Sequence, residues 1–383
     1  MSLILDEHRQ YLSDGPRVSA LAAAVARVVK PGDVVVDLGA GTGILGLLAC
    51  RAGARRVYAI EEGGMIEIAR AICRANGFED RVVFVRGLST NVDLPEKADV
   101  VVADQIGRFG FDAGLLEYFA DARARFLAPS GTTIPSSIAL QAAPVQADAE
   151  WQRVAFWDRP AAGFAVTPAA AIARNTGYPA RFARAHLLAG EATLCTLDAS
   201  ARIASAIKAD VCVRAARAGT LHGIGGWFRA VLAEGITMSN GPLAESRIDR
   251  SNVFFPLARP VALEAGDAIR MAFRILPADL IVSWTVEVWR GAADARRLVV
   301  RDSHSTLDGM LLPREELART SLAFVPKRSP RADARLSVLE LCDGIRPLGD
   351  IEREVYRRHQ DLFRSPDDAA IFVAEVVTRY SVS

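Results

Sequence analysis

Hydrophobic runs alternate with helical patterns over the first third of the chain. Three consecutive valines at 34–36, bounded by Pro31 and Gly32, predict a buried strand. Similar runs precede Glu61, Gly87 and Asp104, and segments with apolar residues at helical spacing separate them. Strands that alternate with helices are typical of a parallel, doubly wound sheet, so we expect an α/β domain over residues 1–135.

The pattern changes after residue 127, where short alternating runs of hydrophobic and polar residues replace the helical segments. Residues 268–275 and 282–288 alternate cleanly. This period of two predicts an antiparallel sandwich or barrel, with one face exposed to water, over residues 136–325. Residues 151–186 interrupt it with tryptophans, prolines and alanine-rich stretches, and we expect an inserted arm that forms a subunit contact.

A third unit follows the proline-rich and basic linker at 326–331. Leucines at 336, 339 and 341 precede Asp343-Gly344, a turn signal, and two amphipathic helical patterns come after it. Residues 331–383 are therefore expected to form a small helical or winged-helix domain.

Composition narrows the classes of function. The chain has 383 residues and a net charge of +1, so no overall basic field points to nucleic acid. The start lacks a signal-peptide pattern, and no apolar run reaches the about 18 residues of a membrane span. Histidines and cysteines show no metal-ligand spacing. We expect a cytoplasmic protein without a metal site. The five cysteines are scattered and odd in number: Cys50, Cys73, Cys195, Cys212 and Cys342.

A glycine-rich turn after the first strand provides the main chemical signal. Glycine permits positive φ and a close approach of the backbone, so the following helix N-terminus can face a nucleotide-type cofactor. The turn also matches the dinucleotide pattern G-x-G-x-x-G, which leaves a nicotinamide-dependent oxidoreductase open. A carboxylate beside the turn argues against a pyrophosphate and favours S-adenosylmethionine, which carries an ammonium and a sulfonium. The predicted contacts are Asp37, Gly39, Gly41, Gly43, Ile44 and Leu45.

Acidic and glycine residues also end the later strands of this domain. Glu61 follows the second strand, in a position to accept hydrogen bonds from a ribose diol, and Gly87 follows the third. Ligands of doubly wound sheets bind beyond the carboxyl ends of the strands. These positions therefore converge with Asp37 and Asp104 on one crevice.

The pattern D-x-G-x-G-x-G is similar to the glycine motif of class I methyltransferases, and residues 1–300 resemble protein arginine methyltransferases. The lead at 8–17 matches the family's H-E-E-M-L-x-D-x-x-R at four positions, and 219–228 resembles its H-G-x-x-x-W-F strand. The resemblance implies a Rossmann-like sheet followed by a β-barrel, S-adenosylmethionine as cofactor with S-adenosylhomocysteine as product, and a homodimer through the arm. It also implies that Arg17 binds the cofactor carboxylate, that His8 closes over it, and that an adenine wall is formed by Gly87, Leu88, Ser89 and Thr90.

The acceptor loop differs from the family pattern. The family holds a guanidinium between two glutamates, but here Asp104 replaces the first and Ala113 falls at the second position. The family's loop histidine is absent from 247–249. One carboxylate compensates a buried guanidinium poorly, so the loop puts arginine as the acceptor in doubt. The predicted catalytic residues are Asp104, which orients the acceptor and takes its proton, and Glu117, which supplies a second carboxylate.

The segment 339–351 resembles the L-x-x-x-D-G core of the peptide chaperones of pyrroloquinoline quinone biosynthesis, winged-helix proteins that bind leader peptides. The leading hypothesis is thus a methyltransferase that acts on a peptide or protein, including a ribosomally synthesised peptide. Two further alternatives are a catalytically weakened methyltransferase fold that serves as a binding or scaffold protein, and a small-molecule N- or O-methyltransferase.

Overall fold

A computed structural model of the chain describes residues 4–199, 201, 204–291, 297–311, 313–319 and 321–381. The chain divides into two compact units, Met1–Met310 and Leu311–Ser383. The first unit contains both predicted sheet regions. One hydrophobic core runs through them, from Leu21 and Val35 to Phe228 and Val288.

A five-stranded parallel sheet forms the N-terminal part of the first unit, as the sequence predicts. Its strands lie in the order β3-β2-β1-β4-β5, so the chain reverses its direction across the sheet between β1 and β4. A crevice beyond the carboxyl ends of these two strands is the usual ligand site of such a sheet. The strands are β1 (Val34–Leu38), β2 (Arg56–Glu61), β3 (Val82–Arg86), β4 (Ala98–Val102) and β5 (Leu127–Ile134).

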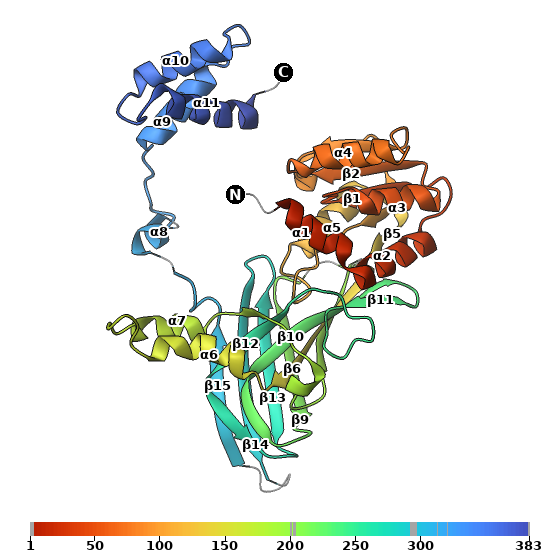
Figure 1. Cartoon of the computed structure of the whole chain (residues 1–383), viewed down its shortest axis with the longest axis vertical. Coiled ribbons are helices and arrows are strands. Elements are labelled where there is room, and N and C mark those ends of the chain that lie inside the picture. Colours follow the sequence, from red (N-terminus) through yellow and green to blue (C-terminus); the bar gives the residue numbers. More distant parts are fainter. Residues whose placement is uncertain are drawn as a thin grey trace. The chain divides into compact units, whose positions relative to one another are not determined.

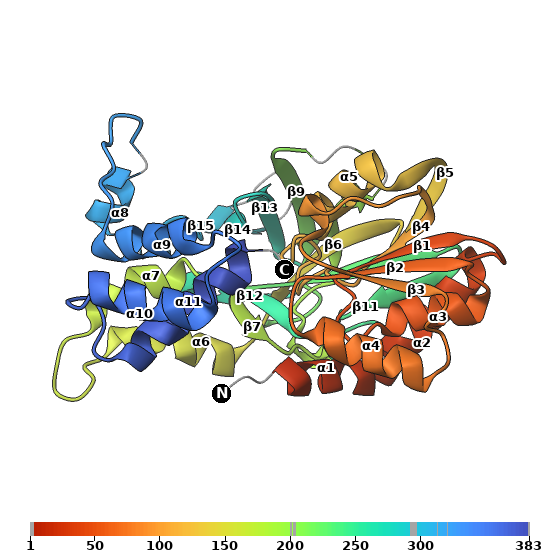
Figure 2. The same cartoon turned by 90° about the horizontal axis from the view of Figure 1, so that it is seen from above.

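Helices cover both faces of this sheet, with α2, α3 and α4 on one side and α5 on the other (Figures 1 and 2). Asp14 caps α2, because its side chain accepts a hydrogen bond from the backbone of Arg17 at 3.2 Å. This cap therefore fixes the position of Arg17 in the first turn of α2. The elements are α1 (Ile4–Ser13), α2 (Gly15–Val28), α3 (Ile44–Ala52), α4 (Met65–Ala75), α5 (Leu115–Arg125) and the short η1 (Ser89–Asn91).

Two antiparallel sheets follow, which agrees with the period-two pattern after residue 127. Trp284 joins them, since its indole N–H donates to the carbonyl of Pro256 at 3.0 Å and its ring lies 5.2 Å from that of Phe255. The first sheet contains β6 (Ser137–Val145), β7 (Tyr178–Ala180), β8 (Ala192–Asp198), β10 (Gly219–Ala233), β11 (Ile236–Ser239) and β12 (Asn252–Leu263), and the second β9 (Ile207–Arg214), β13 (Ala268–Leu276), β14 (Ile281–Arg290) and β15 (Arg297–Ser305).

Helices are inserted between β6 and β7, where the sequence predicts the arm; the predicted range 151–186 also takes in β7, which pairs with β12 and belongs to the sheet. His222 of β10 anchors the base of the arm: Nδ1 accepts the N–H of Ala147 at 3.0 Å, and Nε2 lies 3.1 Å from Asp148. Phe156 and Phe164 of the arm are 53% and 74% exposed, and its predicted role as a subunit contact stays a prediction. The arm contains α6 (Asp148–Ala155), η2 (Phe156–Asp158), η3 (Thr167–Ala169) and α7 (Ala170–Arg174), and η4 (Arg184–His186) follows β7.

The second unit is helical. Its core includes Val338, Ile351 and Phe372, and the described residues of 311–383 form no strand, so we find the helical alternative rather than a winged helix. None of the helices in the described ranges is long and apolar enough to cross a membrane. The helices are α8 (Arg314–Arg319), α9 (Pro330–Leu341), α10 (Leu348–Arg358) and α11 (Pro366–Tyr380).

The separate core of the second unit predicts separate unfolding. Phe372 is 2% exposed, so Phe372→Ala should destabilise this unit by about 3–5 kcal/mol. All five tryptophans lie in the first unit, so the unfolding midpoint measured by their fluorescence should stay unchanged. The part of the helical circular dichroism signal that comes from the second unit should be lost at a lower denaturant concentration. Ile371→Ala, at a site 70% exposed, is the control. A shifted fluorescence midpoint in the Phe372 variant would contradict independent units.

Candidate cofactor and acceptor site

The glycine turn after β1 has the backbone that its sequence predicts. Gly39, Gly41 and Gly43 have φ values of +63°, +54° and +76°, in the left-handed region that favours glycine. A Cβ on Gly41 would lie 2.5 Å from Cε1 of His8, and one on Gly39 would lie 2.2 Å from Nε2 of Gln105. Both side chains therefore lie directly against the turn, where they would contact a ligand held there. The helix that follows begins at Ile44, with Leu45 buried.

Asp37 is fully buried beneath this turn. Its Oδ2 accepts the N–H of Gly46 at 2.9 Å, whereas Oδ1 has no hydrogen-bond partner among the described residues. Burial raises the pKa of Asp37 to about 7; the Gly46 hydrogen bond opposes this shift and the charge of Glu61 adds to it. The carboxyl is therefore close to half ionised at neutral pH, and a nearby cation would favour the ionised form.

Glu61 lies at the end of β2, beside the same turn. Its Oε2 accepts the N–H of Gly41 at 3.0 Å, and its Oε1 accepts that of Gly63 at 2.7 Å. Each carboxylate oxygen can accept more than one hydrogen bond, so Glu61 can also receive ligand hydroxyls.

The predicted adenine wall adjoins Glu61. The N–H of Gly87 donates to the carbonyl of Glu61 at 3.1 Å, which brings the loop after β3 to the turn. In this loop Leu88 is half-buried, Ser89 is buried and Thr90 is exposed. The guanidinium of Arg125 donates to the carbonyl of Ser89 and fixes the loop from α5.

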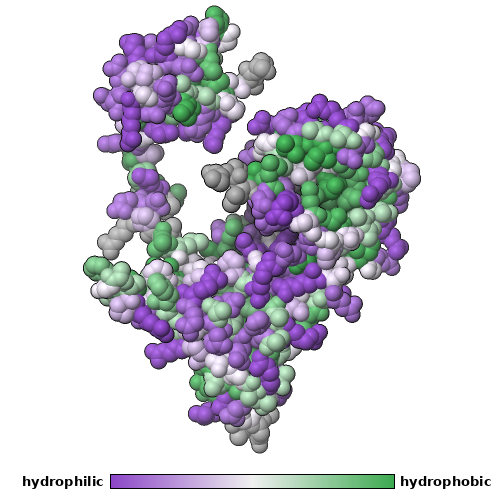
Figure 3. Space-filling model, in the orientation of Figure 1, coloured by the Kyte–Doolittle hydropathy of each residue, from purple (hydrophilic) through white to green (hydrophobic). Residues whose placement is uncertain are grey.

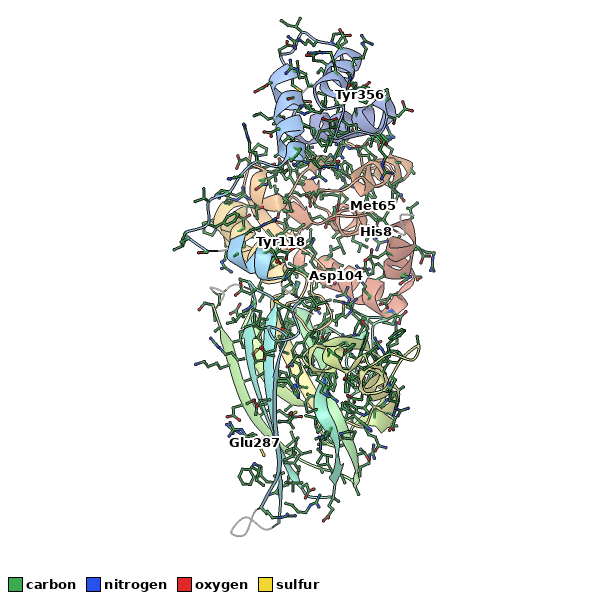
Figure 4. All side chains as sticks on the ribbon, turned by 90° about the vertical axis from the view of Figure 1, so that its left-hand side faces the viewer. His8, Met65, Asp104, Tyr118, Glu287 and Tyr356 are labelled. Carbon is green, nitrogen blue, oxygen red and sulfur yellow. The ribbon has the colours of Figure 1, made fainter. Side chains whose placement is uncertain are left out.

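Asp104, just after β4, is the centre of a buried charge cluster. Its side chain is 6% exposed and its Oδ2 receives two arginines: Nε of Arg17 and, at 3.3 Å, Nη2 of Arg250. Oδ1 is buried and has no partner in the described part of the chain. Arg17 also donates from Nη1 to the carbonyl of Tyr11 at 2.8 Å. Figure 4 shows Asp104 where the parallel sheet meets the antiparallel strands.

The other acidic residues near this loop have different positions. Asp112 accepts the N–H groups of Arg108 and Phe109 at 3.0 and 2.8 Å, so it closes the turn of the loop and does not face Asp104. Glu117 is exposed on α5 and shares no ion pair with Asp104 or its arginines. The structure thus gathers His8, Asp37, Glu61, Gly87 and the glycine turn on one side, with Arg17 and Asp104 beside them, and leaves Glu117 outside.

Sequence reasoning missed two residues of the site, Gln105 and Arg250. Arg250 directly follows the loop at 247–249, which replaces the family's histidine loop, and this position was the signal available in the sequence. The backbone N–H of Asp249 donates to Oδ2 of Asp14 at 2.8 Å, which holds this loop against the start of α2.

Metal ligands are not clustered in the described ranges: no group of three or more His, Cys, Asp or Glu side chains is placed to hold an ion.

Comparisons with known proteins find similarity to methyltransferases. A family model for ribosomal protein L11 methyltransferase (PrmA) matches residues 19–158. Protein arginine N-methyltransferase PRMT10 of Oryza sativa subsp. japonica is 38% identical over 146 residues, 38% of this chain and 38% of that protein. Probable protein arginine N-methyltransferase 6.1 of O. sativa subsp. indica is 35% identical over 153 residues, 39% of this chain and 40% of the relative. The chain thus spans about two fifths of these relatives.

Solved structures extend the likeness across the first unit. The Trypanosoma brucei PRMT1 enzyme–prozyme heterotetrameric complex with AdoHcy aligns with a TM-score of 0.69 at 20% identity, covering 78% of this chain and 97% of that chain. Arabidopsis thaliana protein arginine methyltransferase 10 aligns with a TM-score of 0.67 at 21% identity, covering 79% and 98%. The chain therefore has the class I methyltransferase fold in the form found in arginine methyltransferases.

The raised pKa of Asp37 predicts a stability that falls with pH in the ligand-free protein. Folding favours the protonated carboxyl, so its contribution is full below the unfolded value of 3.8 and is lost as the pH rises through about 7. The free energy of unfolding of Asp37→Asn, taken relative to that of the wild type, should therefore rise by about 2–3 kcal/mol between pH 5 and 8.5. Urea unfolding followed by tryptophan fluorescence measures this, with the exposed Asp80→Asn as control. A difference independent of pH would contradict the buried titration.

Proposed function

We propose that this chain is an S-adenosylmethionine-dependent methyltransferase that acts on a peptide or protein. The observation that carries the proposal is the convergence of His8, Glu61 and the buried Asp37 on the left-handed glycine turn of a class I methyltransferase sheet. The identity of 35–38% to arginine methyltransferases supports it. Asp37 argues against a nicotinamide cofactor, since its charge would oppose a pyrophosphate.

The residues present fit this cofactor, which supplies an electrophilic methyl group on a sulfonium. Glu61 would bind the ribose hydroxyls, and the unpartnered Oδ1 of Asp37 gives a negative charge that a cation stabilises. Arg17 uses Nε on Asp104 and Nη1 on Tyr11, which leaves Nη2 to bind the cofactor carboxylate. His8 covers the turn from α1, and residues 87–90 provide the wall for the adenine.

Asp104 is the residue that we assign to the acceptor. Methyl transfer is an in-line displacement, so the protein mainly has to hold the acceptor lone pair in position and, where needed, take a proton. The buried Oδ1 of Asp104 is an open hydrogen-bond acceptor for an N–H or O–H of that group. Glu117 is exposed on α5 and makes no ion-pair contact with Asp104 or its two arginines, so we assign the acceptor role to Asp104 alone.

The acceptor is proposed to belong to a polypeptide. The relatives carry the name arginine methyltransferase, and they do not bear out the doubt that the acceptor loop raised about arginine. A guanidinium therefore stays among the acceptors to be tested.

The second unit is proposed to recognise the polypeptide. Figure 3 shows a mostly hydrophilic surface on this unit, with a hydrophobic patch. Ile345 and Ile371 are 85% and 70% exposed and Leu348 is 44% exposed, so all three aliphatic side chains are accessible to a ligand. Apolar side chains of a bound segment would cover them.

Cofactor binding tests the first part of the proposal. Calorimetric titration of S-adenosylhomocysteine should show micromolar binding, about −8 kcal/mol, and Asp37→Ala/Glu61→Ala should weaken it by several kcal/mol. Glu61→Gln removes the charge that faces the ribose with little change in volume, and exposed Glu62→Gln is its matched control. Absence of binding to the wild type would move the scaffold alternative to the front.

Peptide recognition is tested on the full chain. A peptide substrate is first selected from a synthetic array by transfer of a tritiated methyl group, and its KM and kcat are then compared between variants. Ile345→Asp/Ile371→Asp should raise KM at least tenfold while kcat changes little, because these two side chains would bind parts of the peptide that are distant from the methylated residue. Glu375→Gln on the same helix is the control, and an unchanged KM would refute the recognition role, as would unchanged peptide affinity after deletion of residues 331–383.

A further inference from the structure

Arg250 contacts the acceptor carboxylate from the loop before β12. Its Nη2 lies 3.3 Å from Oδ2 of Asp104, and its Nη1 donates to the carbonyl of Gly107 at 3.3 Å. The guanidinium also lies 5.8 Å from the ring centre of Phe228, and the side chain is 14% exposed. One guanidinium is thus held by a carboxylate, a backbone carbonyl and an aromatic ring, which together form a site of the kind that binds a cation.

We propose that Arg250 determines acceptor specificity, because it already pairs with Oδ2 of Asp104 and a cationic acceptor that binds the open Oδ1 has to displace it from the carboxylate. This inference rests on the proposed methyltransferase function.

The charges around Asp104 explain why a cationic acceptor has to displace Arg250. Asp104 provides one negative charge to two guanidinium groups, those of Arg17 and Arg250. A cofactor carboxylate bound by Arg17 would balance the first, so Asp104 and Arg250 would then form a neutral pair. A second guanidinium brought to the open Oδ1 would be an uncompensated positive charge next to Arg250, in a site with little solvent to screen it. A neutral acceptor has no such conflict.

The displacement is a rotation of one side chain, since the backbone on both sides of Arg250 is fixed. The N–H of Asp249 donates to Asp14 at 2.8 Å, and the carbonyl of Ser251 accepts from the side chain of Asn240 at 2.9 Å. Asn240 is fully buried. The loop can therefore keep its place while the Arg250 side chain leaves Asp104.

Arg108 offers a matched control. It lies on the acceptor loop, is exposed, and donates from Nε to Oγ of Ser251 at 2.9 Å without an ion pair to Asp104. Arg108→Met thus makes the same change of charge and side chain near the site, but leaves the carboxylate occupied.

The test uses two probes of nearly the same shape and different charge, the cationic N-acetyl-arginine amide and the neutral N-acetyl-citrulline amide, which has a carbonyl oxygen in place of one NH2 group. Each is titrated into protein saturated with S-adenosylhomocysteine. Arg250→Met should bind the arginine probe at least tenfold more tightly than the wild type and the citrulline probe within threefold of it. Arg108→Met should leave both affinities unchanged. Arg250→Gln retains polar contacts and should show the same preference for the arginine probe. It replaces Arg250→Met in the test if that variant folds poorly.

The outcomes separate this inference from the function on which it rests. If the wild type binds no S-adenosylhomocysteine, the proposed function fails. If it does, and the Arg250 variants bind the arginine probe equally or more weakly, Arg250 positions Asp104 instead of competing for it and the inference is wrong. A tenfold gain shared by the citrulline probe would also overturn it, because relief of volume rather than of charge would then be responsible.

Discussion

The compensation of one buried carboxylate by two arginines is the constraint on which the site depends. Asp104 follows β4, Arg17 lies in α2 and Arg250 precedes β12, so a single oxygen joins the N-terminal helices, the parallel sheet and the antiparallel sheets. A buried carboxylate without a partner is costly, and so is a buried guanidinium. The three segments therefore hold one another in place. A ligand that binds one of the arginines changes how the charges of the other arginine and of Asp104 are compensated.

Two buried asparagines give this charge cluster its support. The amide of Asn240 donates to the carbonyls of Arg108 and Ser251 at 2.8 and 2.9 Å, and that of Asn252 donates to the carbonyl of Asn240 at 2.7 Å. Both side chains are 0% exposed. Because buried amides are costly unless their hydrogen bonds are made, this arrangement fixes the acceptor loop relative to the loop that carries Arg250. The backbone is rigid here, and the arginine side chains are the parts that can exchange partners.

The cofactor half of the site could be predicted from the sequence, because local rules determine it. Positive φ explains the glycines of the turn, and parallel strands bring Asp37, Glu61 and Gly87 to one edge of the sheet. The acceptor half depends on tertiary packing: Arg250 lies 146 residues after Asp104, and no period or motif relates them. Asp112 lies in the same loop, but its carboxylate already accepts two backbone N–H groups. In the second unit, amphipathic helices around a turn suit helical and winged-helix domains equally.

The replacement of a second acceptor carboxylate by an arginine contact changes how the site is balanced. A site with two carboxylates and no ligand has an excess of negative charge, which a cationic acceptor relieves. Here Ala113 is exposed and both Arg17 and Arg250 contact Asp104, so the ligand-free cluster has two positive charges to one negative charge. Cofactor and acceptor must then each provide contacts that compete with those of an arginine. A site of this kind selects its ligands by what they can displace, and contacts made by other parts of a bound ligand can supply the binding energy for that exchange.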